Sequence, residues 1–299
     1  MKFYLQPALL SPPPALELTE TEYAQLAEAR LILTSAFSLE ENYDLLVGNY
    51  LELENSVLSL SATTMLRQQH EYHDMFELNA EMNRRAVNFL SSARLFVDQI
   101  RQRVSTCCGD ADEIKLRLSA EYDRTFDYRF MEALRNHVQH SGSAIHGLST
   151  GGSWWPRHKK FKQIFAIEVF TQKRFLELDP KFKKATLREC PDKVDFMGAA
   201  REYLKSLSLV HDFARTNVKE NVNNARTCFE MAINRYKTYS GSSAIGLNAV
   251  CKLEGGKTDR VSILLDWDDV RLRLQKRNRS LKNLNDSIIA NGMIPTYDH

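Results

Sequence analysis

The chain has 299 residues, of which 43% are hydrophobic and 26% are charged, so it has the composition of a globular protein with one large domain or two. No apolar run approaches the roughly 18 residues that a membrane-spanning helix needs, and residues 1–14 lack the basic start and cleavage pattern of a signal peptide. The five cysteines have no metal-ligand spacing, and the adjacent Cys107 and Cys108 are poorly placed to bond each other. We therefore expect reduced thiols in a cytoplasmic protein without a membrane partner.

The net charge of +2 hides an uneven distribution of charge along the chain. Residues 1–60 contain two basic and nine acidic side chains, whereas residues 157–193 contain eleven basic and five acidic ones. A basic segment of this density can neutralise phosphate groups, although a solvated surface would have the same composition.

The N-terminal part predicts a short irregular or strand-like stretch and then two helices. Thr19 and Glu22 have the spacing of a capping box, so the first helix is expected to run from there to about Phe37. Ser38 is a candidate cap for a second helix, which should continue to about Arg67. The candidate core residues of the two helices are Tyr23, Leu26, Leu31, Leu33, Leu45, Leu46, Tyr50, Leu53, Val57 and Leu60.

The polar segment that follows contains His70 and His73 beside carboxylates. Two imidazoles three residues apart can bind a metal ion. Because no distant Cys or His stands out as a further ligand, we favour a polar connection between helices and predict no metal site.

The longest predicted helix covers residues 76–106 and ends at Gly109. Its apolar residues recur at helical spacing: Phe89, Leu90, Ala93, Phe96, Val97, Ile100 and Val104. A short amphipathic segment over residues 111–122 separates it from a further helix, which should end at Ser141 and Gly142 because glycine tolerates left-handed geometry.

The end of that further helix carries the hexapeptide Arg-Asn-His-Val-Gln-His, from Arg135 to His140. The apolar stripe of the helix consists of Phe130, Leu134 and Val138. Asn136 and His140 are four residues apart and share a face, and Arg135 lies about 100° from Asn136. A group of Arg and His without a carboxylate suits a phosphodiester better than a peptide or a sugar.

This hexapeptide resembles the R-N-x-x-x-H signature of HEPN-superfamily ribonucleases. Residues 83–98 resemble the long helix that precedes the motif helix in a bacterial branch of that superfamily, and residues 128–130 fit it too. The resemblance covers about residues 40–145. It implies a mainly α fold, a HEPN-like antiparallel helical bundle, in which the motif helices of two subunits face each other and cut RNA without metal.

The motif residues can be given chemical roles because RNA carries its own nucleophile, the 2′-hydroxyl. His140 is the candidate acid or base. The guanidinium of Arg135 can donate hydrogen bonds to two phosphate oxygens at once. Asn136 would orient His140 or the phosphate. One chain supplies a single motif, so a homodimer is needed to provide both a base and an acid. We expect a 2′,3′-cyclic phosphate product, no cofactor, a role as a toxin or antiviral effector, and an antitoxin or regulatory partner.

Residues 146–160 predict a flexible loop rich in Gly and Ser. Tryptophans beside cations are typical of proteins that bind single-stranded RNA, although the tryptophans could instead anchor the loop to the core. The candidate RNA-binding residues are His137, Trp154, Trp155, Arg157, Lys159 and Lys160.

Residues 161–299 are predicted to form an accessory α+β region that follows a helical domain over residues 1–145. Strands are expected at 163–170 and 260–267, and helices over 192–238 and from Asp268 to about Ile289. Two alternatives to a ribonuclease stay open: a non-catalytic HEPN-type scaffold that binds a nucleotide or a partner protein, and a metal-dependent enzyme that uses His70 and His73.

Overall fold

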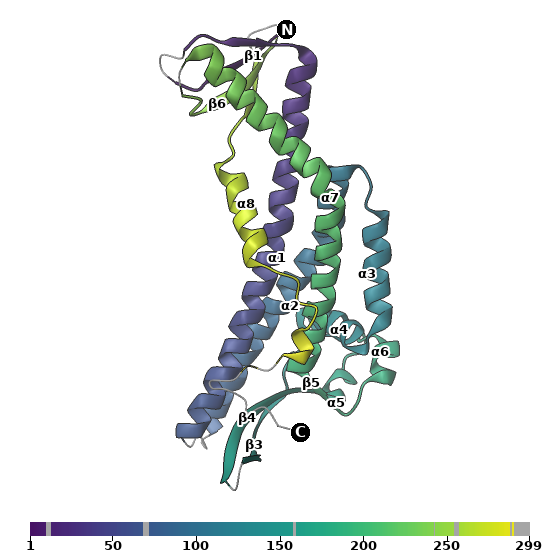
Figure 1. The fold of residues 1–299 in the computed structure, drawn as a ribbon. Helices are drawn as coiled ribbons and strands as arrows, with labels where there is room; N and C mark the ends of the chain where they lie inside the picture. Colours follow the sequence, from purple (N-terminus) through teal and green to yellow (C-terminus); the bar gives the residue numbers. More distant parts are fainter. Residues whose placement is uncertain are drawn as a thin grey trace. The chain divides into compact units, whose positions relative to one another are not determined.

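Three long helices make up much of the chain in the computed structural model (Figure 1): α1 (Glu20–Leu66), α2 (Tyr72–Cys108) and α7 (Phe196–Ser240). The shorter helices are α3 (Asp112–Arg124), α4 (Phe126–His140), α5 (Lys173–Leu176), α6 (Lys184–Glu189), α8 (Asp266–Arg277) and the 3-10 turn η1 (Leu284–Asp286). The strands are β1 (Lys2–Pro7), β2 (Leu16–Leu18), β3 (Gly147–Arg157), β4 (Lys160–Gln172), β5 (Lys193–Asp195), β6 (Leu247–Lys252) and β7 (Thr258–Ser262). The predicted mainly α fold with a smaller α+β part is confirmed.

The structure describes residues 1–9, 13–67, 72–157, 160–241, 243–253, 257–287 and 289, without the side chains of residues 72, 150–157 and 160–162. Among the helices of these residues, none has the length and apolar character that crossing a membrane requires.

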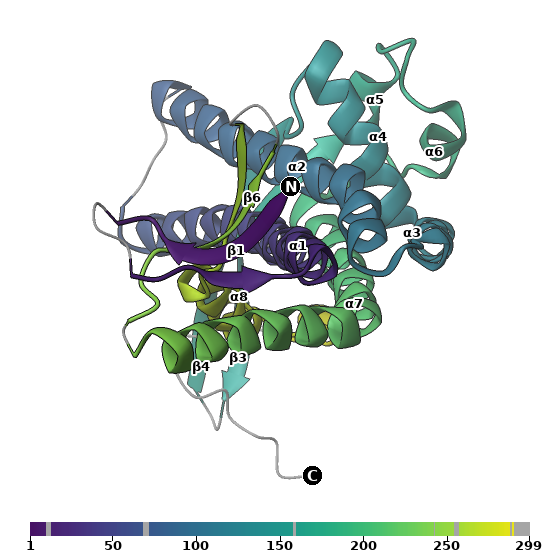
Figure 2. The ribbon, with the colours of Figure 1, turned by 90° about the horizontal axis from the view of Figure 1, so that it is seen from above.

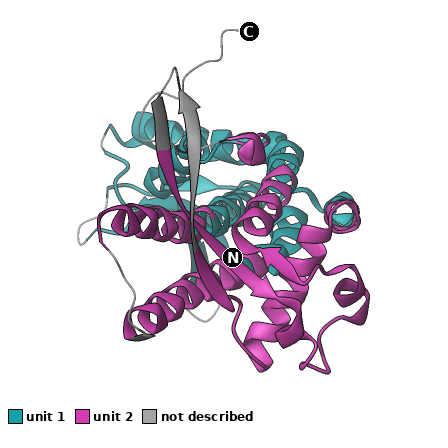
Figure 3. Cartoon of the chain, turned by 90° about the horizontal axis from the view of Figure 1, so that it is seen from below, with its two compact units in different colours: residues 1–46, 95–117, 210–279 teal, residues 47–94, 118–209, 280–299 magenta. Residues whose placement is uncertain are grey.

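The chain divides into two compact units, each assembled from three segments (Figure 3). Unit 1 contains residues 1–46, 95–117 and 210–279, and unit 2 contains residues 47–94, 118–209 and 280–299. The units are interleaved along the sequence because α1, α2 and α7 each contribute residues to both. The predicted domain boundaries at residues 145 and 161 do not coincide with the end of any segment of either unit.

Helix α1 begins as predicted and continues further than predicted. The backbone N–H of Thr19 donates to the Glu22 carboxylate (2.7 Å), and the Glu22 N–H donates to Thr19 Oγ1 (3.1 Å), so the capping box is confirmed. The predicted break at Ser38 is wrong: the buried stripe continues without interruption through Leu33, Ala36, Leu39, Tyr43 and Leu46. A local cap signal at a serine does not end a helix whose apolar period is maintained by burial.

Two predicted core residues of α1 are wrong, since Leu31 and Leu45 are 62% and 48% exposed.

Unit 1 contains a four-stranded antiparallel sheet in the order β2-β1-β6-β7. Strands β1 and β6, which are far apart in the sequence, pair in it (Figure 2). The register places Leu5 opposite Ala249. Strand β6 was not predicted. The strand predicted over residues 260–267 is shorter and lies at 258–262, because α8 begins at Asp266.

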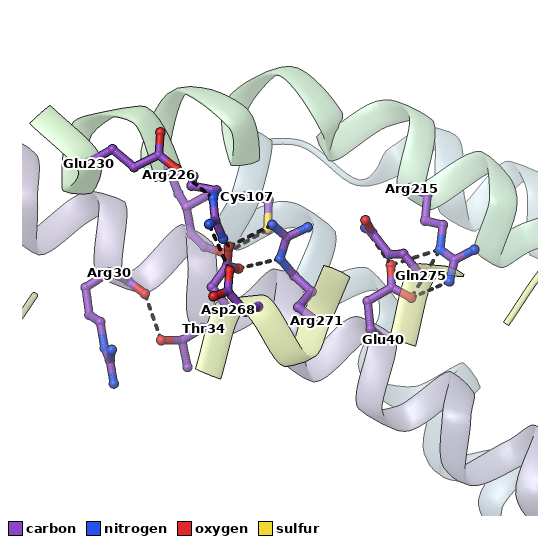
Figure 4. Close-up of polar contacts among 12 residues, drawn as sticks. Arg30, Thr34, Glu40, Cys107, Arg215, Arg226, Glu230, Asp268, Arg271 and Gln275 are labelled. Carbon is purple, nitrogen blue, oxygen red and sulfur yellow. Dashed lines mark hydrogen bonds and ion pairs between the residues drawn. The ribbon is translucent and has the colours of Figure 1, made fainter. Parts of the chain in front are cut away.

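Helix α8 of unit 1 is held by buried ion pairs (Figure 4). The fully buried Asp268 binds Arg226 (2.6 Å) and Arg271, and Gln275 donates to Glu40 (3.0 Å). The helix ends at Arg277, not near Ile289 as predicted. The next residue, Asn278, leaves helical geometry, and its side-chain amide donates to Asp44 (2.7 Å).

Unit 2 contains a three-stranded antiparallel sheet in the order β3-β4-β5. The predicted flexible loop over residues 146–160 is wrong, because residues 147–157 form β3, which pairs with β4 from Gly147↔Phe170 to Arg157↔Lys160. The strand predicted at 163–170 is confirmed within β4. Its β-branched and aromatic residues favour an extended backbone, and the glycine-rich segment pairs with it along its whole length.

Candidate active site

Helix α4, which carries the motif, is fixed at its start and along one face. The hydroxyl of Thr125 accepts from the N–H of Tyr128 (3.3 Å) and caps the helix. Of the predicted apolar stripe, Phe130 and Leu134 are fully buried and Val138 is half-buried. The opposite face of the last two turns is therefore left for polar residues.

Glu132 ties α4 to two neighbouring helices of unit 2, one turn before Asn136. Its carboxylate accepts from the Tyr203 hydroxyl of α7 and lies 3.3 Å from the Arg94 guanidinium of α2. Burial, followed by the charge of Glu132, raises the pKa of Tyr203 well above its ordinary value, so the phenol stays protonated and donates. These contacts fix the rotation of α4 about its axis.

The predicted catalytic residues lie at the surface of unit 2. Asn136 and His140 are exposed, and Arg135 is half-buried. Nη1 of Arg135 donates to Oδ1 of Asn136 (2.9 Å), so the amide orients the guanidinium. The structure thus brings Arg135 and Asn136 into contact and places His140 one turn further along the same helix.

His137 does not lie at the surface, so its predicted RNA contact is wrong. Only 4% of it is exposed, and its Nδ1 lies 2.7 Å from Oδ2 of Asp179, in the connection between α5 and α6. The hydrogen bond from His137 and that from the Lys181 N–H lower the pKa of Asp179, so this carboxylate is ionised at neutral pH and Nδ1 carries the shared proton. The ring of Phe182 meets the imidazole edge-on at 6.0 Å.

The helix ends where predicted but by a different mechanism. The N–H of Ser141 donates to the His137 carbonyl (2.8 Å), and that of Gly142 reaches the same oxygen at 3.3 Å. Gly142 is not left-handed, unlike Gly109 and Gly241. A Cβ at Gly142 would lie 2.7 Å from Nε2 of His137, so a larger residue here would press on an imidazole that Asp179 holds in place.

The segment after the helix is held from two sides. Asn83 of α2 makes two hydrogen bonds to Ile145: its amide donates to the carbonyl (2.9 Å) and its oxygen accepts from the N–H (2.9 Å). The hydroxyl of Thr171 donates to the Ala144 carbonyl (2.5 Å). Asn83 lies in the long helix predicted before the motif helix, but its role was not predicted, since its partner is 62 residues away.

The remaining candidate residues are placed only in part. The backbones of Trp154, Trp155, Arg157 and Lys160 belong to the β3–β4 hairpin, while Lys159 lies outside the described residues. Their contribution to RNA binding stays a prediction. His70 also lies outside the described residues, and His73 is 3.1 Å from Glu77 on the same helix. Within the described ranges, no group of three or more His, Cys, Asp or Glu could hold a metal ion.

No model of a protein family, no curated protein and no solved structure matches this chain. The assignment of α4 as a candidate ribonuclease site therefore depends on its hexapeptide and on the exposure and contacts of its side chains.

Proposed function

We propose that this protein is a metal-independent endoribonuclease whose active site forms when the α4 helices of two chains meet about a twofold axis. The observation that carries the proposal is the arrangement at the end of α4. An exposed Asn136 and His140 and a partly exposed Arg135 share a helix end that buried contacts hold in place. Basic and imidazole groups without a neighbouring carboxylate in the hexapeptide suit an anionic phosphodiester.

In the proposed reaction, one His140 accepts the proton of the ribose 2′-hydroxyl. The 2′-oxygen then forms a bond to phosphorus while the bond from phosphorus to the 5′-oxygen breaks. The His140 of the second chain donates a proton to the leaving 5′-oxygen. The products are a 2′,3′-cyclic phosphate and a 5′-hydroxyl, and no redox partner or metal takes part in these steps.

Arg135 stabilises the negative charge that develops on the non-bridging phosphate oxygens. A correctly placed donor of this kind typically contributes about 3 to 4 kcal/mol to transition-state stabilisation. Asn136 holds the guanidinium through the bond from Nη1 to Oδ1, which leaves the amide NH₂ free of that contact and able to donate to the phosphate.

The need for two imidazoles makes dimerisation part of the mechanism. Each chain contributes one motif, and a twofold axis presents each residue twice. A cell that contains such an enzyme requires control of it, so the proposal includes an effector role as a toxin or in antiviral defence, restrained in the cytoplasm by an antitoxin or another regulatory partner.

The proposal is tested by incubating the full-length protein with RNA in excess chelator. Cleavage should persist, and the 5′ fragments should end in a 2′,3′-cyclic phosphate. Arg135→Ala and His140→Ala should each reduce the rate by at least about a hundredfold. Gln139→Ala is the matched control, because Gln139 is exposed on the same turn and has no assigned role.

Full activity in His140→Ala would remove the proposal. Absence of cleavage by the wild-type dimer would also remove it, and a thermal shift on adding nucleotide would then favour the non-catalytic scaffold.

A further inference from the structure

A column of flat side chains lies on unit 2, at the start of the connection that follows β4. Phe175 of α5 is 38% exposed. The imidazole of His146 stacks on it with ring centroids 4.6 Å apart and an angle of 29° between the planes. The guanidinium carbon of Arg174 lies 4.8 Å from the centroid of the same phenyl ring, and Arg174 is exposed. Despite these two contacts Phe175 stays partly exposed, next to a half-buried imidazole and an exposed guanidinium.

Hydrogen bonds hold the column in position. Nδ1 of His146 accepts from the N–H of Gln172 (3.1 Å), and Nε of Arg174 donates to the Gln172 side-chain oxygen (2.8 Å). The next residue, Leu176, is fully buried and anchors α5. Burial, and after it the proximity of His137 and Arg174, lowers the pKa of His146 to about 4, so its imidazole is neutral at physiological pH and does not repel the guanidinium.

Two segments of the chain connect the column to the candidate active site. His146 follows the last motif residue by a short segment that Asn83 fixes at Ile145. In the other direction, the connection that begins at α5 reaches Asp179, which binds His137 inside the motif. The two chain segments that lead to the column are therefore both anchored beside the end of α4 within unit 2.

Along the stretch from α5 to the end of α6, which begins at the column, the exposed charge is mainly positive. The exposed basic residues between α5 and the end of α6 are Arg174, Lys181, Lys183, Lys184 and Arg188. The exposed carboxylates of the same stretch are Glu177 and Glu189, and Glu189 is paired with Arg129 of α4 (2.6 Å). A polyanion is therefore attracted to this surface.

We propose that Phe175, with Arg174 and His146, forms a platform on which a base of single-stranded RNA stacks while the neighbouring cations bind its phosphates. This inference rests on the proposed ribonuclease function and names its substrate class: single-stranded RNA, whose unpaired bases have faces free to stack. A duplex keeps its base faces within its own stack and would contact only the cations.

Binding is measured with the full-length His140→Ala protein, which should bind RNA without cutting it. The probes are a fluorescent single-stranded RNA oligomer and a duplex of the same sequence. Phe175→Ala and Phe175→Leu should each weaken single-strand binding roughly five- to hundredfold, while Phe175→Trp retains it. Duplex binding should change little. Leu178→Ala is the matched control, since Leu178 is 78% exposed on the same stretch, and thermal melting checks that every variant is folded.

Equal single-strand affinity in the parent and in Phe175→Leu would overturn the platform. Equal losses for single strand and duplex would also overturn it, as would a parent protein that binds no single-stranded RNA. The two proposals fail separately. If wild-type protein cuts no RNA but Phe175 variants lose single-strand binding, the ribonuclease proposal is removed and the platform proposal is retained. If His140-dependent cleavage is found and Phe175 variants bind normally, only the platform is removed.

Discussion

The two units each contain a histidine buried beside a carboxylate, and the two pairs differ in what surrounds them. In unit 1, Nε2 of His211 lies 3.4 Å from Glu40, and both residues are 1% exposed. In unit 2, His137 is 4% exposed and lies 2.7 Å from Asp179. The residue types and burial are alike, but only His137 is flanked in sequence by exposed polar residues.

The partners of the two carboxylates explain the difference. Glu40 also binds Arg215 at 2.5 Å and Gln275, and the His211 ring stacks on Tyr43 at 3.8 Å, so that pair is the centre of a polar core. Asp179 accepts from the backbone N–H of Lys181, interacts with the side chain of Ser141 and lies on a short connection. The first pair stabilises a unit, whereas the second positions a helix end that carries the candidate active site.

The largest effect is expected from Glu40→Gln. The substitution leaves the partly buried Arg215 without its carboxylate, and breaking such a pair typically lowers the free energy of unfolding by about 3 kcal/mol or more. Urea denaturation measures the change. Glu41→Gln, at the adjacent exposed position, should stay within about 0.5 kcal/mol of wild type. If the two variants are equally stable, the Glu40 pair is not the centre of unit 1.

The same carboxylate predicts a dependence of stability on pH. Burial raises the pKa of Glu40, but the nearby His211 imidazole and the hydrogen bonds from Arg215 outweigh it and bring the pKa to about 2, below the ordinary 4.5. The stabilisation is therefore fully present above a pH of about 4.5 and is lost as the pH falls toward about 2. Unfolding free energies measured across this range should show the wild type and Glu40→Gln converging. A difference in unfolding free energy that stays constant across this pH range would contradict the lowered pKa of Glu40.

A smaller loss of stability is expected from Gly142→Ala at the end of α4. The added methyl group would lie 2.7 Å from Nε2 of His137, and overpacking of this kind costs about 2 kcal/mol. The loss should largely disappear when the same substitution is made in a His137→Ala background. A double-mutant cycle from thermal or urea unfolding measures this coupling, and simple additivity of the two substitutions would mean that the imidazole does not restrict Gly142.

The smallest loss of stability is expected from Asp179→Asn. This substitution should instead lower the rate of RNA cleavage. The amide can still accept from His137, but a bond to a neutral acceptor is weaker than one to a carboxylate. We expect RNA cleavage to fall about three- to tenfold through looser positioning of the motif, with little change in melting temperature. Asp179→Glu is the matched control, because it changes the side chain but keeps the carboxylate charge. Loss of activity only in proportion to the unfolded fraction would show that the pair has no positioning role.

The parts of the fold that depend on local sequence were predicted well. The capping box at Thr19 requires only two residues three positions apart, and the buried stripe of Phe130 and Leu134 follows from helical spacing alone. The same spacing placed Asn136 and His140 on one face, and both are exposed.

The features that were missed depend on partners far away in the chain. Nothing near His137 indicates that it will bind Asp179, which is 42 residues away. The glycine-rich stretch became β3 only because β4 pairs with it, and Ser38 lost its cap role to the burial of Leu39 and Tyr43. Local propensity in these places was overridden by tertiary contacts.

The pairing of β1 with β6 has a consequence for synthesis on the ribosome. The partners of residues 2–7, at residues 247–252, are translated more than two hundred residues later. Until then, one edge of β1 exposes unsatisfied backbone N–H and C=O groups to whatever else is nearby in the cell. A nascent chain of this protein therefore has a long interval in which that edge needs shielding, and a stalled or truncated product keeps it exposed.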